Sequence, residues 1–238
     1  MSEGINALAY TGDERDGRLG IFAVTNSGLY RTYDLLQGWE KLPYGEGVDA
    51  RSLCISVSST DTKTAWIGTA TSGVLVSRDA GASWQQVQQD IFTKAPINII
   101  KQDPQRPASI YVGTTQTLYV SQDGGETWTR RGGGLPVGSY TSVLISPQNS
   151  DEVFVGNAYE GAKGLDHAIK AGGVFRSTDA GMTWQRVDPE LPSRRVWALA
   201  FDARDTSRMF IGSHSAGVYV AQRRGGDQAP PSPSGTDK

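Results

Sequence analysis

The 238-residue sequence predicts an all-β fold assembled from about five similar small sheets. Its composition supplies the first reason, because 29 glycines, six tryptophans and nine tyrosines without a sustained helical pattern are typical of short strands and tight turns. A short motif that recurs along the chain supplies the second reason. Apolar runs surround each copy of the motif in the same order, which indicates a repeat architecture in which each unit is one sheet.

The motif reads Ser-x-Asp-x-Gly-x-(Ser/Thr)-Trp and is intact at residues 77–84, 121–128 and 177–184. An altered copy occupies residues 32–39, and successive motif aspartates are 45, 44 and 56 residues apart. We interpret the motif as a structural turn in which Ser and Asp accept backbone N–H groups, Gly adopts a positive φ and Trp is buried between sheets. The residues with these structural roles are Ser77, Asp79, Gly81, Trp84, Ser121, Asp123, Gly125, Trp128, Ser177, Asp179, Gly181 and Trp184.

Each unit is expected to contain four strands, here A to D, with the motif in the C–D turn. Strand A is expected at residues 7–10, 53–56, 97–100, 143–145 and 196–201, and strand B at 65–68, 110–113, 153–156 and 209–212. Strand C is expected at residues 28–31, 118–120, 173–176 and 217–221, and strand D at 84–87 and 184–187. Such a unit cannot bury both faces alone, so neighbours must stack on it radially. The predicted fold is a β-propeller of about five blades, the last incomplete.

Residues 1–222 are expected to form this single domain, and the Pro/Ser/Gly-rich residues 223–238 a disordered tail. A net charge of −2 argues against nucleic-acid binding, and no apolar run is long enough to span a bilayer. No signal peptide is visible, so the sequence predicts a cytoplasmic protein. The single cysteine, Cys54, excludes an internal disulfide and a cysteine zinc site, and no cofactor or metal is predicted.

The three intact motifs resemble the Asp-box, or BNR, repeat of the sialidase-like superfamily of propellers. The turn at residues 103–114 is similar to the blades of sortilin-type receptors, xyloglucanases and photosystem II assembly factors. This resemblance implies a propeller fold for nearly the whole chain. It leaves function open, because the same repeat occurs in enzymes and in binding scaffolds.

Resemblance to sialidases would imply a Phe-Arg-Ile-Pro motif and an arginine triad, and no such motif precedes the first box. A propeller glycosidase would use two facing carboxylates. The acids expected on the side opposite the boxes are Glu46, Asp49, Asp90, Glu160, Asp166, Asp188 and Glu190, and no spacing pairs any two of them. The sequence therefore predicts that the chain has no catalytic residues and is not an enzyme.

The fourth unit carries an insertion between strands B and C, at residues 157–172. Long loops on a rigid scaffold often carry function, and arginine and aromatic residues are common interface anchors. The candidate partner-binding residues are Tyr140, Tyr159, His167, Arg194, Arg195, Trp197 and His214. Two alternatives stay open, namely that Tyr140 and Trp197 belong to the core, and that the two histidines bind a metal with Asp166.

The favoured interpretation is a non-enzymatic propeller scaffold that binds a protein partner or acts as a subunit or assembly factor of a larger complex. The alternative is a glycan-binding or glycoside-hydrolase-like propeller of the sialidase superfamily.

Overall fold

The computed structural model describes residues 4–87, 91, 94–130, 133–158, 172–188 and 191–222. These residues form five antiparallel sheets and no helix. The first sheet contains β1 (Ile5–Arg15), β2 (Arg18–Thr25), β3 (Gly28–Thr32) and β4 (Glu40–Leu42). The second contains β5 (Ser52–Val57), β6 (Ala65–Thr69), β7 (Val74–Ser77) and β8 (Gln85–Gln86). The third contains β9 (Ile97–Gln102), β10 (Ile110–Thr114), β11 (Leu118–Ser121) and β12 (Thr129–Arg130). The fourth contains β13 (Tyr140–Ile145), β14 (Val153–Asn157), β15 (Gly173–Ser177) and β16 (Gln185–Arg186), and the fifth β17 (Val196–Phe201), β18 (Arg208–Ser213) and β19 (Gly217–Gln222).

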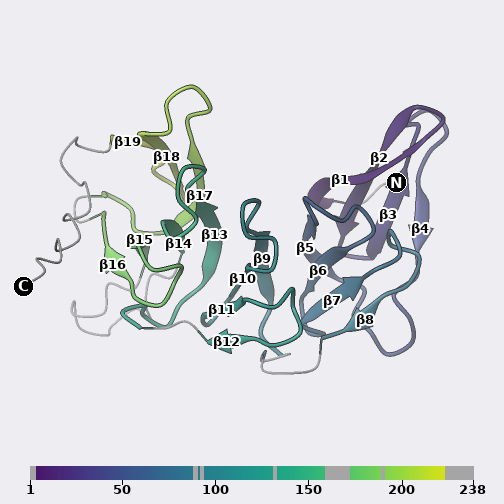
Figure 1. The fold of residues 1–238 in the computed structure, drawn as a ribbon, viewed down its shortest axis with the longest axis horizontal. Coiled ribbons are helices and arrows are strands. Elements are labelled where there is room, and N and C mark those ends of the chain that lie inside the picture. Colours follow the sequence, from purple (N-terminus) through teal and green to yellow (C-terminus); the bar gives the residue numbers. More distant parts are fainter. Residues whose placement is uncertain are drawn as a thin grey trace, which may run out of the picture.

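The five sheets follow one another around an open arc (Figure 1). The first strands of consecutive sheets contact each other along the inner side of the arc, and the short fourth strands lie on its outer side. The predicted propeller of about five blades with an incomplete last blade is confirmed. The arc does not close, since the first and fifth sheets stand on opposite limbs (Figure 1).

A hydrophobic cluster fills each space between consecutive sheets. The second strand of each inner sheet is buried along its whole length, as in β6, β10 and β14. These strands are apolar on both faces because a sheet packs against each of them. Burial between sheets, rather than within one sheet, therefore stabilises the fold.

The same two contacts recur at successive junctions between sheets. An aromatic side chain of the second strand packs on the box glycine of the next sheet, in the pairs Phe22–Gly81, Trp66–Gly125 and Tyr111–Gly181. Two residues further along the second strand, a glycine receives the first residue of the next sheet, in the pairs Gly68–Ile97, Gly113–Tyr140 and Gly156–Val196. A Cβ on these three glycines would approach the neighbouring sheet to between 2.5 and 2.8 Å, so glycine is required there by close packing.

The boxes close their own turns. In the second sheet the Ser77 hydroxyl accepts a hydrogen bond from Gly81 N at 2.8 Å and donates one to Asp79 at 2.8 Å. Asp79 also accepts the backbone N–H of Ser83, and Trp84 donates its indole N–H to the carbonyl oxygen of Gly81. The box glycines have φ values of +85°, +94° and +86° at positions 81, 125 and 181.

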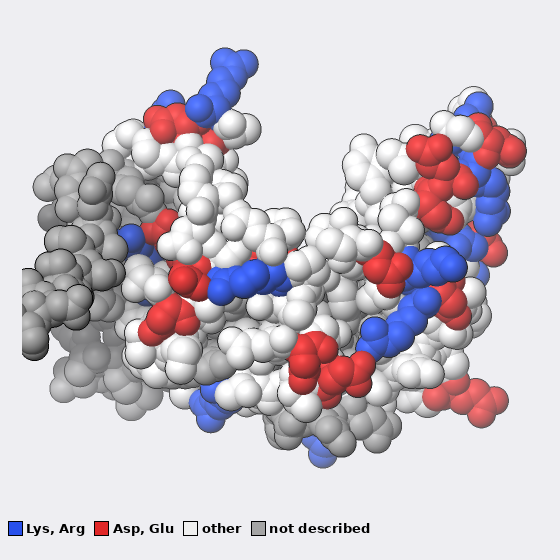
Figure 2. Space-filling view, in the orientation of Figure 1, with Lys and Arg blue, Asp and Glu red and all other residues white. Residues whose placement is uncertain are grey.

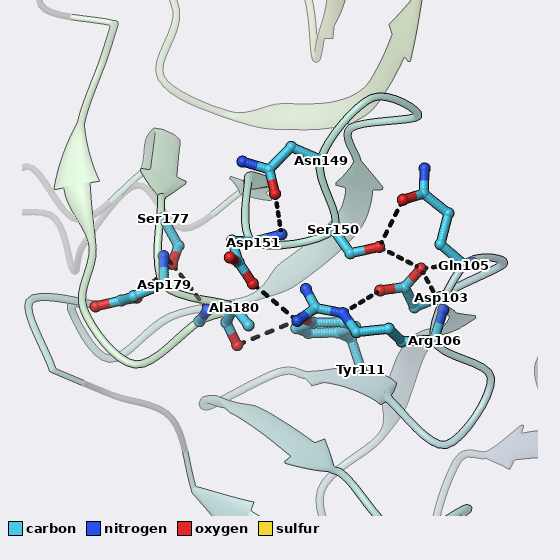
Figure 3. A network of polar contacts seen from close by, with 11 residues as sticks. Asp103, Gln105, Arg106, Tyr111, Asn149, Ser150, Asp151, Ser177, Asp179 and Ala180 are labelled. Carbon is cyan, nitrogen blue, oxygen red and sulfur yellow. Dashed lines mark hydrogen bonds and ion pairs between the residues drawn. The ribbon is translucent and has the colours of Figure 1, made fainter. Parts of the chain in front are cut away.

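A polar network joins the third and fourth sheets beside one of these boxes (Figure 3). The buried Asp103 accepts hydrogen bonds from the Ser150 hydroxyl at 2.9 Å and from the backbone of its own turn. Arg106 extends from that turn to Asp151 at 2.8 Å. The neighbouring Tyr111 hydroxyl donates to the carbonyl oxygen of Ala180 in the box. This side of the sheets is thus tied together by structural contacts.

No helix in the described part of the chain is long and apolar enough to cross a membrane.

Candidate functional site

The two edges of the arc carry different connections. Each intact box is bonded to the turn between the first two strands of its own sheet, through Ala80 N to Lys63 O, Gly124 N to Ala108 O and Ala180 N to Asp151 O. The boxes and these turns therefore share one edge, here called the box edge. The connections between second and third strands, and those between sheets, lie at the opposite ends of the strands, here called the open edge.

An aromatic cluster lies at the open edge of the fifth sheet. The Trp197 and His214 rings are 5.7 Å apart between centroids and inclined by 32°. The His214 Nδ1 atom lies 3.2 Å from Arg195 Nη1 and 2.6 Å from the Ser215 hydroxyl. The backbone N–H of His214 bonds the carbonyl oxygen of Arg195, which fixes the two segments relative to each other. Trp197 and its polar neighbours form a half-exposed platform.

The exposure of Trp197 follows from its place in the repeat. Three other sheets have a polar side chain at the equivalent position, and it donates a hydrogen bond to the first strand of the next sheet. These hydrogen bonds run from Asn6 to Ser52 O, from Asn98 to Tyr140 O and from Thr141 to Val196 O. In the fifth sheet this position holds a tryptophan that is 50% exposed. Exposed indole rings combine a large apolar face with a polar N–H, which suits them to ligand contact.

The other predicted binding residues divide into three groups. Arg195 and His214 lie together with Trp197, and Arg194 is half-buried next to them. Tyr159 and His167 lie outside the described residues. Tyr140 is fully buried, so its assignment to a contact surface is corrected: its backbone oxygen and Cβ lie against Gly113, and its hydroxyl donates to the carbonyl oxygen of Pro136. Burial raises the pKa of the Tyr140 hydroxyl, which stays protonated.

Two of the carboxylates that the sequence suggested have a resolved electrostatic environment. Burial would raise the pKa of Asp49, but hydrogen bonds from Arg51 and Thr71 hold it at about 2, so Asp49 is ionised. Burial raises the pKa of Asp188 in spite of its ion pair with Arg186 at 3.0 Å. Because the Asp188 side chain is 1% exposed, a substrate could not reach it in this arrangement.

Glu46 is exposed at the open edge, whereas Asp90, Glu160, Asp166 and Glu190 lie outside the described residues. The metal site that would use Asp166 falls outside them as well. Within the described ranges, no three His, Cys, Asp or Glu side chains are grouped as metal ligands.

A pocket of about 360 Å³ that the sequence did not indicate lies in the first sheet, around its altered box. Tyr33 and Trp39 line it together with three arginines (Arg15, Arg18 and Arg31) and three acids (Asp16, Asp34 and Glu40). Arg15 stacks on Tyr33 at 4.2 Å, and Arg18 pairs with Asp34. Because charges of both signs balance there, the pocket does not select a charged ligand. The altered box, with its two aromatic residues, was the available signal for it.

The surface between the two limbs of the arc differs from the outer surface. Figure 2 shows charged residues at the tips of the limbs and across the visible face below the hollow, while the walls of the hollow between the limbs are mostly uncharged. A neutral ligand fits such a surface better than a nucleic acid does.

Comparison with known proteins finds a repeat model and two curated relatives that are similar to this chain. The BNR/Asp-box repeat model matches residues 119–130, which contain the box of the third sheet. An oligoxyloglucan-reducing end-specific xyloglucanase of Emericella nidulans is 27% identical over 67% of this chain and 24% of its own length. A xyloglucanase of a Paenibacillus species is 25% identical over 75% of this chain and 21% of its own length. The chain thus spans less than a quarter of the length of these curated relatives.

Solved structures agree on the fold. The GH74 xyloglucanase of Xanthomonas campestris matches with a TM-score of 0.70 and 17% identity, over 96% of this chain and 38% of that one. An ancestral GH74 enzyme matches with a TM-score of 0.70 and 16% identity, over 88% of this chain and 27% of that one. The five sheets therefore share the propeller-blade fold of these GH74 structures.

The relatives overturn two predictions made from the sequence. A non-enzymatic scaffold for a protein partner was the favoured interpretation, and the similarity to two xyloglucanases contradicts it and favours the glycan alternative. The prediction that the chain is not an enzyme is wrong on the same grounds. Both errors arose because the short box motifs indicate a fold and no function. The similarity to xyloglucanases consists of low sequence identity over most of the chain, and no single motif carries it.

Proposed function

We propose that this chain, with its BNR/Asp-box blades, is a glycoside-hydrolase-like propeller that recognises a xyloglucan-type polysaccharide. The observation that carries the proposal is the similarity to two curated xyloglucanases over two thirds or more of the chain. The chain spans less than a quarter of each relative. The proposal therefore has two forms: binding of the polysaccharide, and the more demanding claim that this chain alone also hydrolyses it.

The described surface supports a carbohydrate ligand in two ways. The hollow between the limbs is mostly uncharged, which suits a neutral polysaccharide (Figure 2). The Trp197 ring offers an apolar face for a sugar ring, and Arg195, His214 and Ser215 place hydrogen-bonding groups beside it. Carbohydrate and other small-ligand sites commonly combine one apolar surface with a few convergent polar groups.

Catalysis would need two carboxyl groups on either side of the scissile bond, one of them able to donate a proton. Asp49 is ionised by its hydrogen bonds, and Asp188 has a raised pKa but is shielded from solvent. Neither is therefore assigned a catalytic role, and hydrolysis is tested directly rather than inferred from them.

The test is incubation of the purified protein with xyloglucan and, in parallel, with an unsubstituted glucan and an unrelated neutral polysaccharide. Release of reducing ends measures hydrolysis, and calorimetric titration with soluble fragments measures binding. The proposal expects saturable binding of the xyloglucan fragments, weakened in Trp197→Ala. The matched control is Met182→Ala, which removes an exposed apolar side chain from the box edge. Flat titrations and no reducing ends with all three polysaccharides would refute both forms.

A further inference from the structure

The first and the last sheets each have one apolar face on which no other described sheet packs. On the last sheet the free face consists of Ala198, Ala200, Phe210, Gly212, Val218 and Val220, which pair across β17, β18 and β19. On the first sheet it includes Ile5, Leu8 and Tyr10 of β1 and Ile21 of β2. These names, last-sheet face and first-sheet face, are used below.

Exposure shows that both faces are unfilled copies of an inner junction. Val218 is 70% exposed, whereas Val74, which occupies the same register position in the second sheet, is fully buried. Leu8 is 60% exposed, whereas its counterpart Ile100 in the third sheet is 2% exposed. The same side chains that are covered in the inner sheets thus stand open at both ends of the arc.

Gly212 lacks the close contact with a neighbouring sheet that requires glycine at the equivalent inner positions. Its φ lies outside the left-handed region, and the nearest atom to an added Cβ is Ala198 Cβ at 3.3 Å, within its own sheet. In contrast, the first residue of the next sheet occupies the space beside the equivalent glycines, which are Gly68, Gly113 and Gly156. At Gly212 the three nearest atoms of the described residues all belong to Ala198 of the same sheet, and none belongs to a neighbouring sheet.

The first sheet carries the matching residue. Ile5 pairs with Thr25 in the register position that Ile97, Tyr140 and Val196 occupy in the inner sheets. Those three are fully buried on a glycine of the preceding sheet, while Ile5 is 48% exposed. One chain therefore holds both an unoccupied glycine hole and an unused aliphatic knob, on opposite limbs of the arc (Figure 1).

We propose that the last-sheet face docks the first-sheet face of a second copy of this chain, with Ile5 of one copy seated on Gly212 of the other. This contact would repeat the packing of a first-strand residue on a glycine that joins the inner sheets. The contact is heterologous, since two different faces meet. The proposal does not depend on carbohydrate binding.

The first test is sedimentation velocity over a concentration series. We expect the full chain to associate reversibly, and Gly212→Leu to weaken association roughly tenfold or more because its side chain fills the hole that Ile5 needs. The control is Ala82→Leu, which introduces the same side chain at an exposed position on the box edge. Unchanged far-ultraviolet circular dichroism of both variants shows that the sheets are intact. A chain that is monomeric at every concentration overturns the proposal.

Cross-linking identifies which face meets which. In the inner junctions a Cβ built on the glycine lies 2.7 Å from Ile97 Cβ, 3.0 Å from Tyr140 Cβ and 3.5 Å from Val196 Cβ. A disulfide needs about 3.5 to 4.5 Å between Cβ atoms, so a small separation of the two faces would bring such a pair into range. The Ile5→Cys chain and the Gly212→Cys chain are each oxidised alone, and a mixture of the two is oxidised in parallel. Cys54 is buried and does not take part. A covalent dimer that forms only in the mixture, and not when Ala82→Cys replaces Ile5→Cys, supports the proposal. No dimer in the mixture, or a cross-linked monomer from dilute chains that carry both cysteines, would show that the faces do not join two copies.

Discussion

At the scale of single residues, the box aspartates hold the turns in place by accepting several hydrogen bonds each. Asp123 accepts the Thr127 backbone N–H at 2.9 Å, the Thr127 hydroxyl at 2.5 Å and the Ser121 hydroxyl at 2.7 Å. Replacing Asp123 with alanine removes all three contacts. We expect a loss of about 1 kcal/mol in the free energy of unfolding, the size of a lost helix cap.

Urea unfolding followed by circular dichroism measures this loss. The control is Glu126→Ala, which removes an exposed carboxylate from the same turn and its surface ion pair with Arg78. Surface pairs of this kind contribute little, so the control should stay close to the wild type. An Asp123→Ala protein as stable as the control would contradict the structural role of the carboxylate.

The same aspartates make stability depend on pH. Hydrogen bonds from the Thr127 hydroxyl and then its backbone N–H hold the pKa of Asp123 at about 2, and Ser83 lowers the pKa of Asp79 in the same way. An unfolded aspartate titrates near 3.9, so the folded state gains stability above about pH 4 and loses it as the pH falls toward 2. We expect the Tm to fall over this range, and to fall less steeply in Asp123→Asn. Parallel curves for the two proteins would contradict the assignment.

At the scale of the strands, two glycines at the same register position are expected to respond differently to one methyl group. A Cβ at Gly113 would lie 2.6 Å from Ile99 Cγ2 and 2.7 Å from the backbone oxygen of Tyr140, so the third and fourth sheets would have to separate. Gly113→Ala should cost about 1 to 3 kcal/mol, as overpacking does. Gly212→Ala, whose closest neighbour would be 3.3 Å away, should change the stability of the monomer little.

Thermal unfolding of both variants at low protein concentration tests this difference, since dilution keeps association from contributing to the Tm. Equal losses at the two positions would show that the strand itself, rather than the facing sheet, requires glycine.

At the scale of the whole molecule, the repeat made the fold readable from the sequence. Box spacing and the apolar runs around each box predicted the sheets and the missing fourth strand of the last one, because three copies share the same turn residues and all copies have apolar runs in the same order. The arc was harder to predict, since closure depends on contacts between residues 200 positions apart. The burial of Tyr140 shows the same limit, because an aromatic residue at the start of a strand packs inward only if a glycine faces it.

The candidate site was only partly readable. Trp197, His214 and Arg195 were singled out as residue types, but their contact depends on how β17 and the β18–β19 turn meet. Composition could not decide between a protein and a polysaccharide as the ligand, because exposed aromatic and arginine residues serve both. The similarity to two xyloglucanases is the ground on which a polysaccharide is proposed as the ligand.

Titration of the protein with soluble xyloglucan fragments, followed by tryptophan fluorescence and calorimetry, tests the central claim most directly. The account predicts saturable binding by the wild type and by Met182→Ala, together with a loss of affinity of roughly tenfold or more in Trp197→Ala. A folded wild-type protein that shows no saturable change with xyloglucan fragments would contradict it.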